Sequence, residues 1–241
     1  MNSYYKRPRL YTDQELKEGQ RISLTQEQAH HLKNVLRLKS EDSVRLFNGE
    51  DGEWLGFTEE LSKKTNTFRI ETHIRPQPVS TNSVSLYFAP IKKHRQDWLI
   101  EKAVELGVTD LHIVITQNTA VRSINEKRIV TQIKEAAEQS EQMHLATLHS
   151  PISLDNFLGQ KNLRPKSLYA CLERCDSTKS LEEVKKDALL TRTAIMIGPE
   201  GGYTEEEKAK ILAHSACIPV SLGNHVLRCE TAAIKALILS S

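Results

Sequence analysis

Two apolar runs of strand length, each ending in a glycine-containing loop, constrain the fold of this chain most. Ala194–Ile197 leads into Gly198–Gly202, and Pro219–Leu222 leads into Gly223. A helix-like stretch follows each loop. In open α/β sheets the crevice at the carboxyl ends of strands is the usual ligand site. Glycine there permits positive φ or close approach of a ligand to the backbone. The two segments therefore predict a binding site at one edge of a sheet.

From residue 83 onwards, predicted strands alternate with predicted helices. Strands joined by helices predict a parallel sheet that is covered on both faces, although the order of its strands does not follow from the pattern. The predicted strands are Val84–Ala89, Leu111–Ile115, Ser167–Leu172, Thr193–Ile197 and Cys217–Leu222. The predicted helices include Arg95–Leu106, Glu126–Gln142, Thr204–Ala213 and Glu230–Leu239.

The N-terminal third has a different pattern. Thr25–Gln28 has the sequence of a capping box and precedes a short helical pattern. Three strand-like stretches follow, with Asn-Gly and Asp-Gly turn sequences between them: Ser43–Asn48, Glu53–Leu61 and Asn66–His73. We therefore predict a small β-barrel over residues 1–74, a polar, proline-containing linker over 75–82, and an α/β domain over 83–241.

The composition is that of an ordinary soluble protein, with 39% hydrophobic and 27% charged residues in 241 positions. No apolar run reaches the roughly 18 to 20 residues that span a bilayer, and the N-terminal residues lack the apolar region of a secretory signal. The four cysteines lack C-x-x-C spacing, and the adjacent His30 and His31 point to different sides of a helix. The sequence predicts a cytoplasmic protein with no membrane segment and no metal site.

The net charge is only +2, but basic residues gather in three places. The first cluster lies beside Tyr4, Tyr5 and Tyr11, and tyrosines next to cations suit base stacking combined with phosphate contacts. Each cluster alone is equally compatible with an ordinary solvated surface. Together they predict RNA contacts from Lys6, Arg7, Arg9, Lys33, Arg37, Lys92, Lys93 and Arg95.

The glycine loops carry a family resemblance. Gly198–Gly202 and Leu222–Ala232 resemble the cofactor loops of the SPOUT methyltransferases, and most closely those of the RsmE-type enzymes, which methylate N3 of a uridine in 16S ribosomal RNA. Three further stretches are similar to the same family: His30–Leu38 with Phe47–Gly49, then Glu101–Val108, and Glu138–Ser140. The matches run in order from about residue 30 to the end of the chain.

The resemblance implies a SPOUT-type parallel sheet with a C-terminal trefoil knot and an N-terminal PUA-like or OB-like barrel that binds RNA. It also implies S-adenosylmethionine as cofactor, a homodimer with the cofactor crevice near the subunit interface, and 16S ribosomal RNA within the assembled small subunit as substrate. Two positions depart from the family pattern, Gln142 in place of an arginine and Cys229 in place of a threonine.

The first loop has neither a dinucleotide fingerprint nor a P-loop sequence, and Pro199 removes an amide that a phosphate cradle would use. An adenosine-like ligand with apolar contacts to its faces fits better. The predicted cofactor-binding residues are Leu172, Ile197, Gly198, Pro199, Glu200, Gly201, Leu222, Gly223, Val226 and Leu227.

Methylation at N3 of uracil requires loss of the N3 proton. Arg228 is expected at the mouth of the crevice, where it could orient the uracil carbonyls and stabilise the developing anion. The general base is Glu200 or Glu230, with His225 a third candidate, and the sequence does not choose among them.

Two alternatives remain at this stage. One is an RNA-binding or assembly protein that keeps the fold without catalysis, although the intact loop glycines argue against it. The other is a SPOUT methyltransferase that acts on transfer RNA, although the N-terminal barrel argues against it. Fold alone does not decide the substrate.

Overall fold

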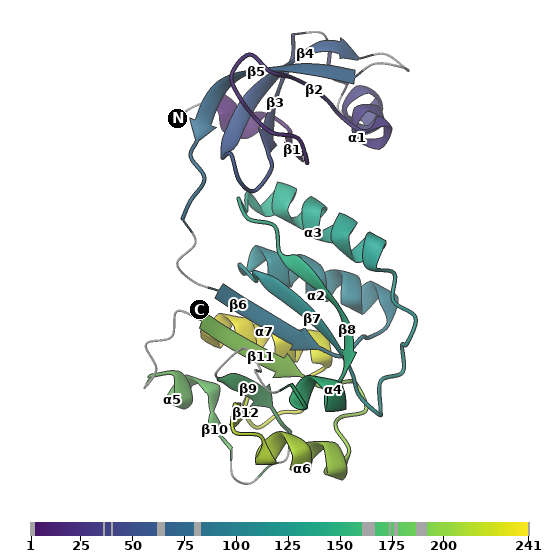
Figure 1. Cartoon of the computed structure of the whole chain (residues 1–241), viewed down its shortest axis with the longest axis vertical. Helices are drawn as coiled ribbons and strands as arrows, with labels where there is room; N and C mark the ends of the chain where they lie inside the picture. Colours follow the sequence, from purple (N-terminus) through teal and green to yellow (C-terminus); the bar gives the residue numbers. More distant parts are fainter. Residues whose placement is uncertain are drawn as a thin grey trace. The chain divides into compact units, whose positions relative to one another are not determined.

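The structure is a computed structural model that describes residues 3–35, 37–39, 41–61, 66–79, 83–160, 167–173, 175, 178–186 and 192–240. The chain forms two compact units (Figure 1). The first combines Met1–Val79 with Ala137–Leu145, and the second combines Ser80–Ala136 with Ala146–Ser241. Residues 80–82 of the predicted linker lie outside the described residues. The grouping of Ala137–Leu145 with the first unit was not predicted.

The first unit is built on a five-stranded sheet with the order β1-β3-β4-β5-β2. Its edge strand β1 pairs with β3 in parallel, and the other pairs are antiparallel. Buried aliphatic and aromatic side chains, including Leu32, Leu46 and Phe68, form its core. The strands are β1 (Arg9–Tyr11), β2 (Arg21–Ser23), β3 (Ser43–Phe47), β4 (Glu53–Leu61) and β5 (Asn66–Arg75).

Helical segments in this unit are short. Ser3–Lys6 forms a 3₁₀ turn, and α1 (Gln26–His30) continues as a π-helical turn over His31–Val35. The predicted capping box before α1 is confirmed, since Thr25 N–H donates to Oε1 of Gln28 and Gln28 N–H donates to the Thr25 hydroxyl oxygen, both over 3.2 Å.

The second unit is built on a seven-stranded sheet in which every strand pair is parallel. The strand order is β10-β12-β9-β11-β6-β7-β8. The strands are β6 (Ser83–Phe88), β7 (Asp110–Ile115), β8 (Thr147–Ser153), β9 (Leu168–Cys171), β10 (Lys179–Ser180), β11 (Arg192–Ile197) and β12 (Cys217–Ser221). The parallel sheet confirms the predicted fold class, while its two edge strands, β8 and β10, were not predicted.

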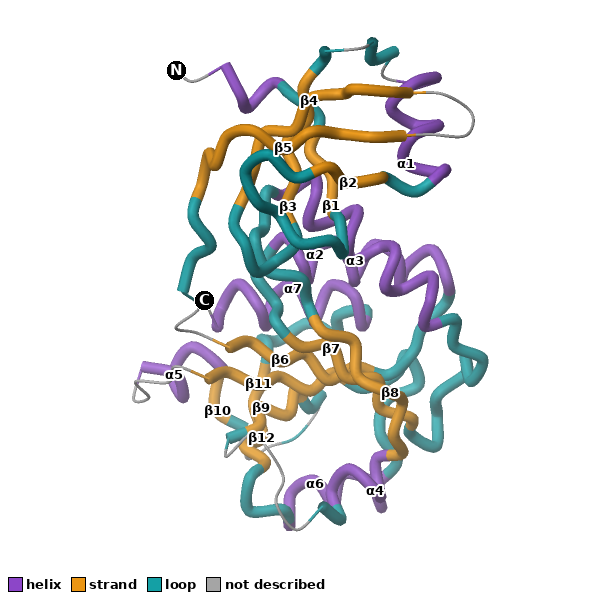
Figure 2. Tube along the Cα trace, turned by 45° about the horizontal axis from the view of Figure 1, so that its top comes forward, coloured by secondary structure: helices purple, strands orange, loops and turns teal. Residues whose placement is uncertain are grey.

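Helices cover both faces of this sheet (Figure 2). The helices α2 (Lys93–Glu105) and α7 (Cys229–Ser240) pack together on one face. The other face carries α4 (Leu154–Leu158) and α6 (Glu205–Ala213), whose apolar residues share a core with Tyr87 and Met196 of the sheet. Two further helices are α3 (Glu126–Ser140), between β7 and β8, and α5 (Leu181–Lys186), after β10. The C-terminal knot stays a prediction.

The strand order places a third strand between the two glycine loops. The two strands that end in glycine loops, β11 and β12, are not neighbours, because β9 lies between them and pairs with both. The residue that follows β9, Leu172, therefore lies between the two loops. No described helix has the combined length and apolar character needed to cross a membrane.

Candidate active site

A cavity of about 830 Å³ opens where β9, β11 and β12 end. Its volume falls within the range of about 300 to 1,000 Å³ that is usual for small-molecule and cofactor sites. All ten residues predicted to bind a cofactor line it: Leu172, Ile197, Gly198, Pro199, Glu200, Gly201, Leu222, Gly223, Val226 and Leu227. The structure thus brings these residues to one place, and their role in cofactor binding stays a prediction.

The loop after β11 has a backbone shape that depends on glycine. Gly202 has φ +68°, and its N–H donates to the carbonyl oxygen of Pro199 over 2.9 Å. A Cβ atom at Gly198 would lie only 2.7 Å from the ring of Tyr203. A side chain at Gly198 would therefore displace the buried Tyr203 ring, so the loop requires glycine there.

The loop after β11 is also held by a segment that follows β7. The Asn118 amide Nδ2 donates to the carbonyl oxygens of Gly201 (3.3 Å) and Gly202 (3.0 Å). This role of Asn118 was not predicted, because no local sequence pattern reveals a contact between residues this far apart in the chain.

A capping box begins α6, and its glutamate makes a further contact. Thr204 N–H donates to Oε2 of Glu207 over 3.0 Å, and Glu207 N–H donates to Oγ1 of Thr204 over 3.2 Å. Oε1 of the buried Glu207 also accepts from the backbone N–H of Gln117 over 2.8 Å. One carboxylate therefore fixes both the start of α6 and the segment that carries Asn118.

The loop after β12 supplies a more open wall. Gly223 has φ +112°, a left-handed conformation that side chains rarely adopt. Val226 lines the cavity with 61% of its surface exposed, which leaves an apolar side chain available to a ligand. Burial raises the pKa of the Cys171 and Cys229 thiols to about 12, so both are protonated near neutral pH and are poor nucleophiles.

The candidate catalytic carboxylates differ in their surroundings. Glu200 lines the cavity, and its Oε1 accepts a hydrogen bond from Nη1 of Arg95 over 3.0 Å. Glu230 is 8% exposed and is not among the lining residues; its Oε1 lies 3.7 Å from Nε of Arg95. Its buried Oε2 has no hydrogen-bond partner among the described residues.

Arg228 and His225 both line the cavity and are exposed. The cation that pairs with Glu230 is Arg95, and the Arg228 guanidinium makes no ion pair or side-chain hydrogen bond with the described part of the chain. Arg228 is therefore available to a ligand, and it lines the cavity as its predicted place at the crevice mouth requires.

Comparison with known proteins gives the family. Residues 78–241 match the RNA methyltransferase domain family, and residues 24–71 match the RNA methyltransferase PUA domain family. A ribosomal RNA small subunit methyltransferase E from Rickettsia conorii is 32% identical over 230 residues, which cover 95% of this chain and 93% of the relative. This chain belongs to the small subunit methyltransferase E family. The protein of the same name from Synechocystis is 32% identical over 90% of this chain and 71% of its own length.

Solved structures of similar proteins agree over nearly the whole chain. A putative methyltransferase from Legionella pneumophila, in complex with the cofactor S-adenosylmethionine, has a TM-score of 0.84 and 30% identity, with 97% of each chain covered. A small subunit methyltransferase E from Neisseria gonorrhoeae, bound to S-adenosylmethionine, has a TM-score of 0.84 and 27% identity, with 96% of this chain and 95% of that chain covered.

The predicted RNA-binding residues of this family member are placed as follows. Lys92 and Arg95 line the cavity, and Lys93 is exposed at the start of α2. In the first unit, four predicted residues are exposed: Lys6, Arg7, Lys33 and Arg37.

Arg9 is the exception, because its side chain is buried. It is 6% exposed, and its Nε lies 2.5 Å from Oε1 of Glu53, which is 2% exposed. Its Nη1 donates to the carbonyl oxygen of Ala137 over 2.6 Å, and its guanidinium lies 3.6 Å from the centre of the Phe47 ring. The charge and the donors of Arg9 are thus satisfied inside the unit, so its side chain is not available to a phosphate.

The Glu138–Ser140 motif is placed next to this buried pair. Oε1 of Glu138 accepts from the N–H of Tyr11 over 2.8 Å, and the carbonyl oxygen of Gln142 accepts from Nη2 of Arg9 over 2.9 Å. These contacts join the end of α3 to β1 within the first unit. They give the motif a structural task that does not depend on an arginine at position 142.

Proposed function

We propose that this chain uses S-adenosylmethionine to methylate N3 of a uridine in 16S ribosomal RNA. The observation that carries the proposal is the cavity formed by the two glycine loops and Leu172, in a chain whose relatives from Legionella and Neisseria are bound to S-adenosylmethionine. Family membership supports ribosomal RNA as the substrate class, and the specific N3 position rests on the RsmE-type resemblance. A ribosomal RNA substrate would place the reaction in the cytoplasm.

The residues of the cavity fit the cofactor. Gly201 and Gly223 bring backbone atoms to its surface without a side chain in the way. Leu222, Val226 and Leu227 supply apolar surface for the faces of an adenine ring. Pro199 has no backbone N–H, so the first loop offers one donor fewer to a phosphate. A ligand that has no phosphate group suits this loop better. When bound, S-adenosylmethionine supplies an activated methyl group on a positively charged sulfur.

Side chains at the cavity must promote the loss of the N3 proton and stabilise the charge that develops on the uracil. Neutral uracil carries a proton at N3, so N3 must lose that proton as it becomes nucleophilic. The Arg228 guanidinium lies at the cavity, where it can hold the uracil carbonyl oxygens and stabilise the negative charge that develops on them. Holding N3 in line with the methyl group is the other large contribution that a rigid site makes.

Among the three candidates for the base, the geometry favours Glu200. It lines the cavity, whereas Glu230 does not. Arg95 fixes one oxygen of Glu200 through the 3.0 Å hydrogen bond, which sets the direction of the carboxylate. We propose that Glu200 accepts the N3 proton, directly or through a water molecule, and that Arg95 acts as its positioning residue.

We propose a division of labour between the two units. The match to an RNA methyltransferase PUA domain supports RNA affinity in the first unit, with Lys6, Arg7, Lys33 and Arg37 as exposed cations for phosphates. The second unit carries the cofactor site.

We also propose a homodimer through α2 and α7. Trp98 on α2 is 42% exposed and Ile238 on α7 is 56% exposed, although both are large apolar side chains. They line a shallow hollow of about 370 Å³ with Ile234 and Leu239. A second copy of this chain would bury these side chains, and Ile238→Lys should then convert a dimer into a monomer in light scattering.

The function is tested with the purified chain. We expect S-adenosylhomocysteine to bind in calorimetry, and 16S ribosomal RNA to gain one methyl group at uridine N3, located by mass mapping. Offering naked 16S RNA, intact small subunits and transfer RNA in parallel separates the substrate forms. Binding of S-adenosylhomocysteine with methylation of transfer RNA alone would reject the proposed substrate, and no binding at all would favour a non-catalytic RNA-binding protein.

A further inference from the structure

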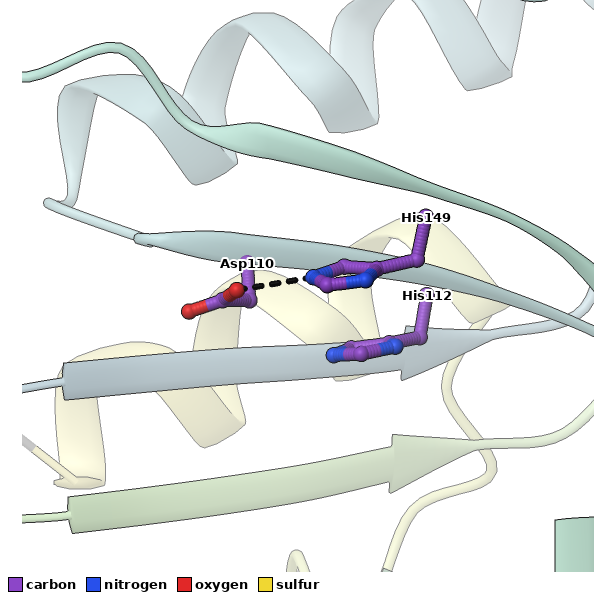
Figure 3. Close-up of side chains that lie close together, drawn as sticks. All are labelled: Asp110, His112 and His149. Carbon is purple, nitrogen blue, oxygen red and sulfur yellow. Dashed lines mark hydrogen bonds and ion pairs between the residues drawn. The ribbon is translucent and has the colours of Figure 1, made fainter. Parts of the chain in front are cut away.

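Two histidines and one aspartate gather on the sheet of the second unit, and none of them lines the cavity. Asp110 and His112 lie two positions apart on β7, so their side chains point to the same face of the sheet. His149 pairs directly with His112 from the neighbouring strand β8. A carboxylate oxygen of Asp110 and one ring nitrogen of each histidine lie within 4.8 Å of one another, and all three are atoms that can bind a metal ion. Figure 3 shows that each imidazole presents a nitrogen on the side where Asp110 lies.

Stacking fixes the plane of the His112 ring. The ring centres of His112 and His149 are 3.9 Å apart at an interplanar angle of 9°. Tyr87 stacks on His112 at 4.1 Å and 5°, and Phe157 packs against Tyr87 at 4.8 Å.

The Asp110 carboxylate is held at both oxygens. Oδ1 lies 2.8 Å from Nε2 of His149, and Oδ2 accepts a hydrogen bond from the Thr109 hydroxyl over 2.8 Å. The Thr109 hydroxyl also accepts from the backbone N–H of Val84 on β6 over 3.0 Å. Metal sites orient carboxylate ligands with hydrogen bonds of this kind from a second layer of residues. The side chains of Asp110 and His149 are 28% and 41% exposed, so an ion could reach them from solvent.

We propose that Asp110, His112 and His149 bind a Zn²⁺ ion. The protein would supply two imidazole nitrogens and one carboxylate oxygen, and water would complete the coordination. This donor set suits zinc and related transition metals. Mg²⁺ and Ca²⁺ prefer sites made of oxygen ligands alone, so these ions should not compete.

Capture of the ion requires a small rearrangement. In a tetrahedral zinc site with bonds of about 2.0 to 2.1 Å, two donor atoms are about 3.4 Å apart. Two stacked imidazole rings are nearly parallel, so their nitrogen lone pairs do not point at the same position. His149 is the ring that can turn, because its side chain is 41% exposed and it lies on the edge strand β8. The zinc–nitrogen bond would replace its hydrogen bond to Asp110.

The ion would fasten β8 to β7. The pairing of these strands is irregular between His112 and Val114, immediately beyond the site. The strand β8 is also where the chain re-enters the second unit, since Ala137–Leu145 groups with the first unit. A bond between the two strands here would stabilise this irregularly paired edge of the sheet, independently of methyl transfer.

The test uses the full chain after removal of metals with a chelator. We expect ZnCl₂ titrated in a calorimeter to bind at one site that MgCl₂ does not occupy. His149→Ala and Asp110→Asn should each weaken Zn²⁺ binding at least tenfold, while His94→Ala, a change at an exposed histidine on α2, should leave it unchanged. Zn²⁺ should raise the melting temperature of the unaltered chain and not that of the two ligand variants.

The absorption spectrum of bound Co²⁺ distinguishes this site from one formed by the cysteines that line the cavity. Co²⁺ bound by two imidazoles and a carboxylate lacks the strong near-ultraviolet bands of thiolate ligation. The proposal is overturned if Zn²⁺ does not bind, if both ligand variants bind it as tightly as the unaltered chain, or if bound Co²⁺ shows thiolate bands. Asp110→Asn is nearly isosteric, so circular dichroism should confirm that this variant folds.

Discussion

Nη1 of Arg95 donates a hydrogen bond to Oε1 of Glu200 over 3.0 Å, joining two residues that are 105 positions apart in the chain. The contact changes the interpretation of Arg95, which the sequence placed among RNA contacts. A guanidinium that already holds a cavity carboxylate has fewer donors left for a phosphate. Arg95 also lies 3.7 Å from Glu230, so it balances the charge of both candidate carboxylates.

Glu200→Gln tests the proposed proton acceptor. The glutamine keeps the size of the side chain and can still accept from Arg95, but it cannot take a proton. General base catalysis typically contributes about 10²-fold to 10⁴-fold in rate, so we expect turnover to fall by about 10²-fold or more. Affinity for S-adenosylhomocysteine should change little. Single-turnover methylation of 16S RNA measures the effect.

Glu205→Gln is the matched control for this change. Its side chain is 90% exposed, pairs with Lys208 on α6 and does not line the cavity. It should methylate at the normal rate. Normal turnover in Glu200→Gln would show that Glu200 is not the base, and His225 and Glu230 would remain as the candidates.

Asn118→Ala tests the support of the first glycine loop. The change removes the hydrogen bonds to the carbonyl oxygens of Gly201 and Gly202 without placing any atom in the cavity. A hydrogen bond contributes about 1 kcal/mol net, so the loss of both should lower the affinity for S-adenosylhomocysteine by up to about thirtyfold. Calorimetry measures it, with Asn156→Ala on α4 as an exposed control. Unchanged affinity would mean that the loop holds its shape without Asn118.

Sequence reasoning reached most of the second unit because its signals are local. The runs that became β11 and β12 are apolar and end at glycines, and the Thr204–Glu207 capping box marks the start of α6. The edge strand β8 was not predicted, because none of its residues is fully buried and Pro151 interrupts it. Its apolar pattern is too weak to distinguish from a loop.

Residues whose roles depend on distant partners could not be predicted. Nothing near Asn118 in the sequence indicates that its amide reaches the glycine loop. Arg9 was misjudged for a related reason: a basic residue beside other basic residues is usually solvated. Its burial depends on Glu53, which lies 44 positions further along the chain.

Arg9→Ala should destabilise the first unit. It would leave the buried Glu53 without its closest cation. Arg75 and Arg45 lie 3.3 and 3.7 Å from the same carboxylate and still balance part of its charge, so we expect a loss of unfolding free energy below the roughly 3 to 5 kcal/mol that an uncompensated buried charge typically costs. Trp54 lies in this unit, so denaturant unfolding followed by its fluorescence in a Trp98→Phe background reports on it. Arg21→Ala, which removes an exposed pair with Glu59, should have little effect. Equal stability of the Arg9 and Arg21 variants would contradict the buried role.

Arg228→Ala should lower turnover, whereas the double change Lys6→Ala with Arg7→Ala should lower RNA affinity. The exposed pair at the N-terminus should contribute to RNA affinity, and removing each cation that binds a phosphate should flatten the salt dependence by about 0.7 to 0.9 log units per log unit of salt. Turnover at saturating RNA should remain normal in the double variant.

Arg228→Ala should instead lower turnover more than RNA affinity, because its guanidinium is expected to act on the charge that develops in the transition state. Filter binding at several salt concentrations and single-turnover methylation distinguish the two effects. Normal RNA binding by the double variant, or normal turnover by Arg228→Ala, would contradict this division of labour.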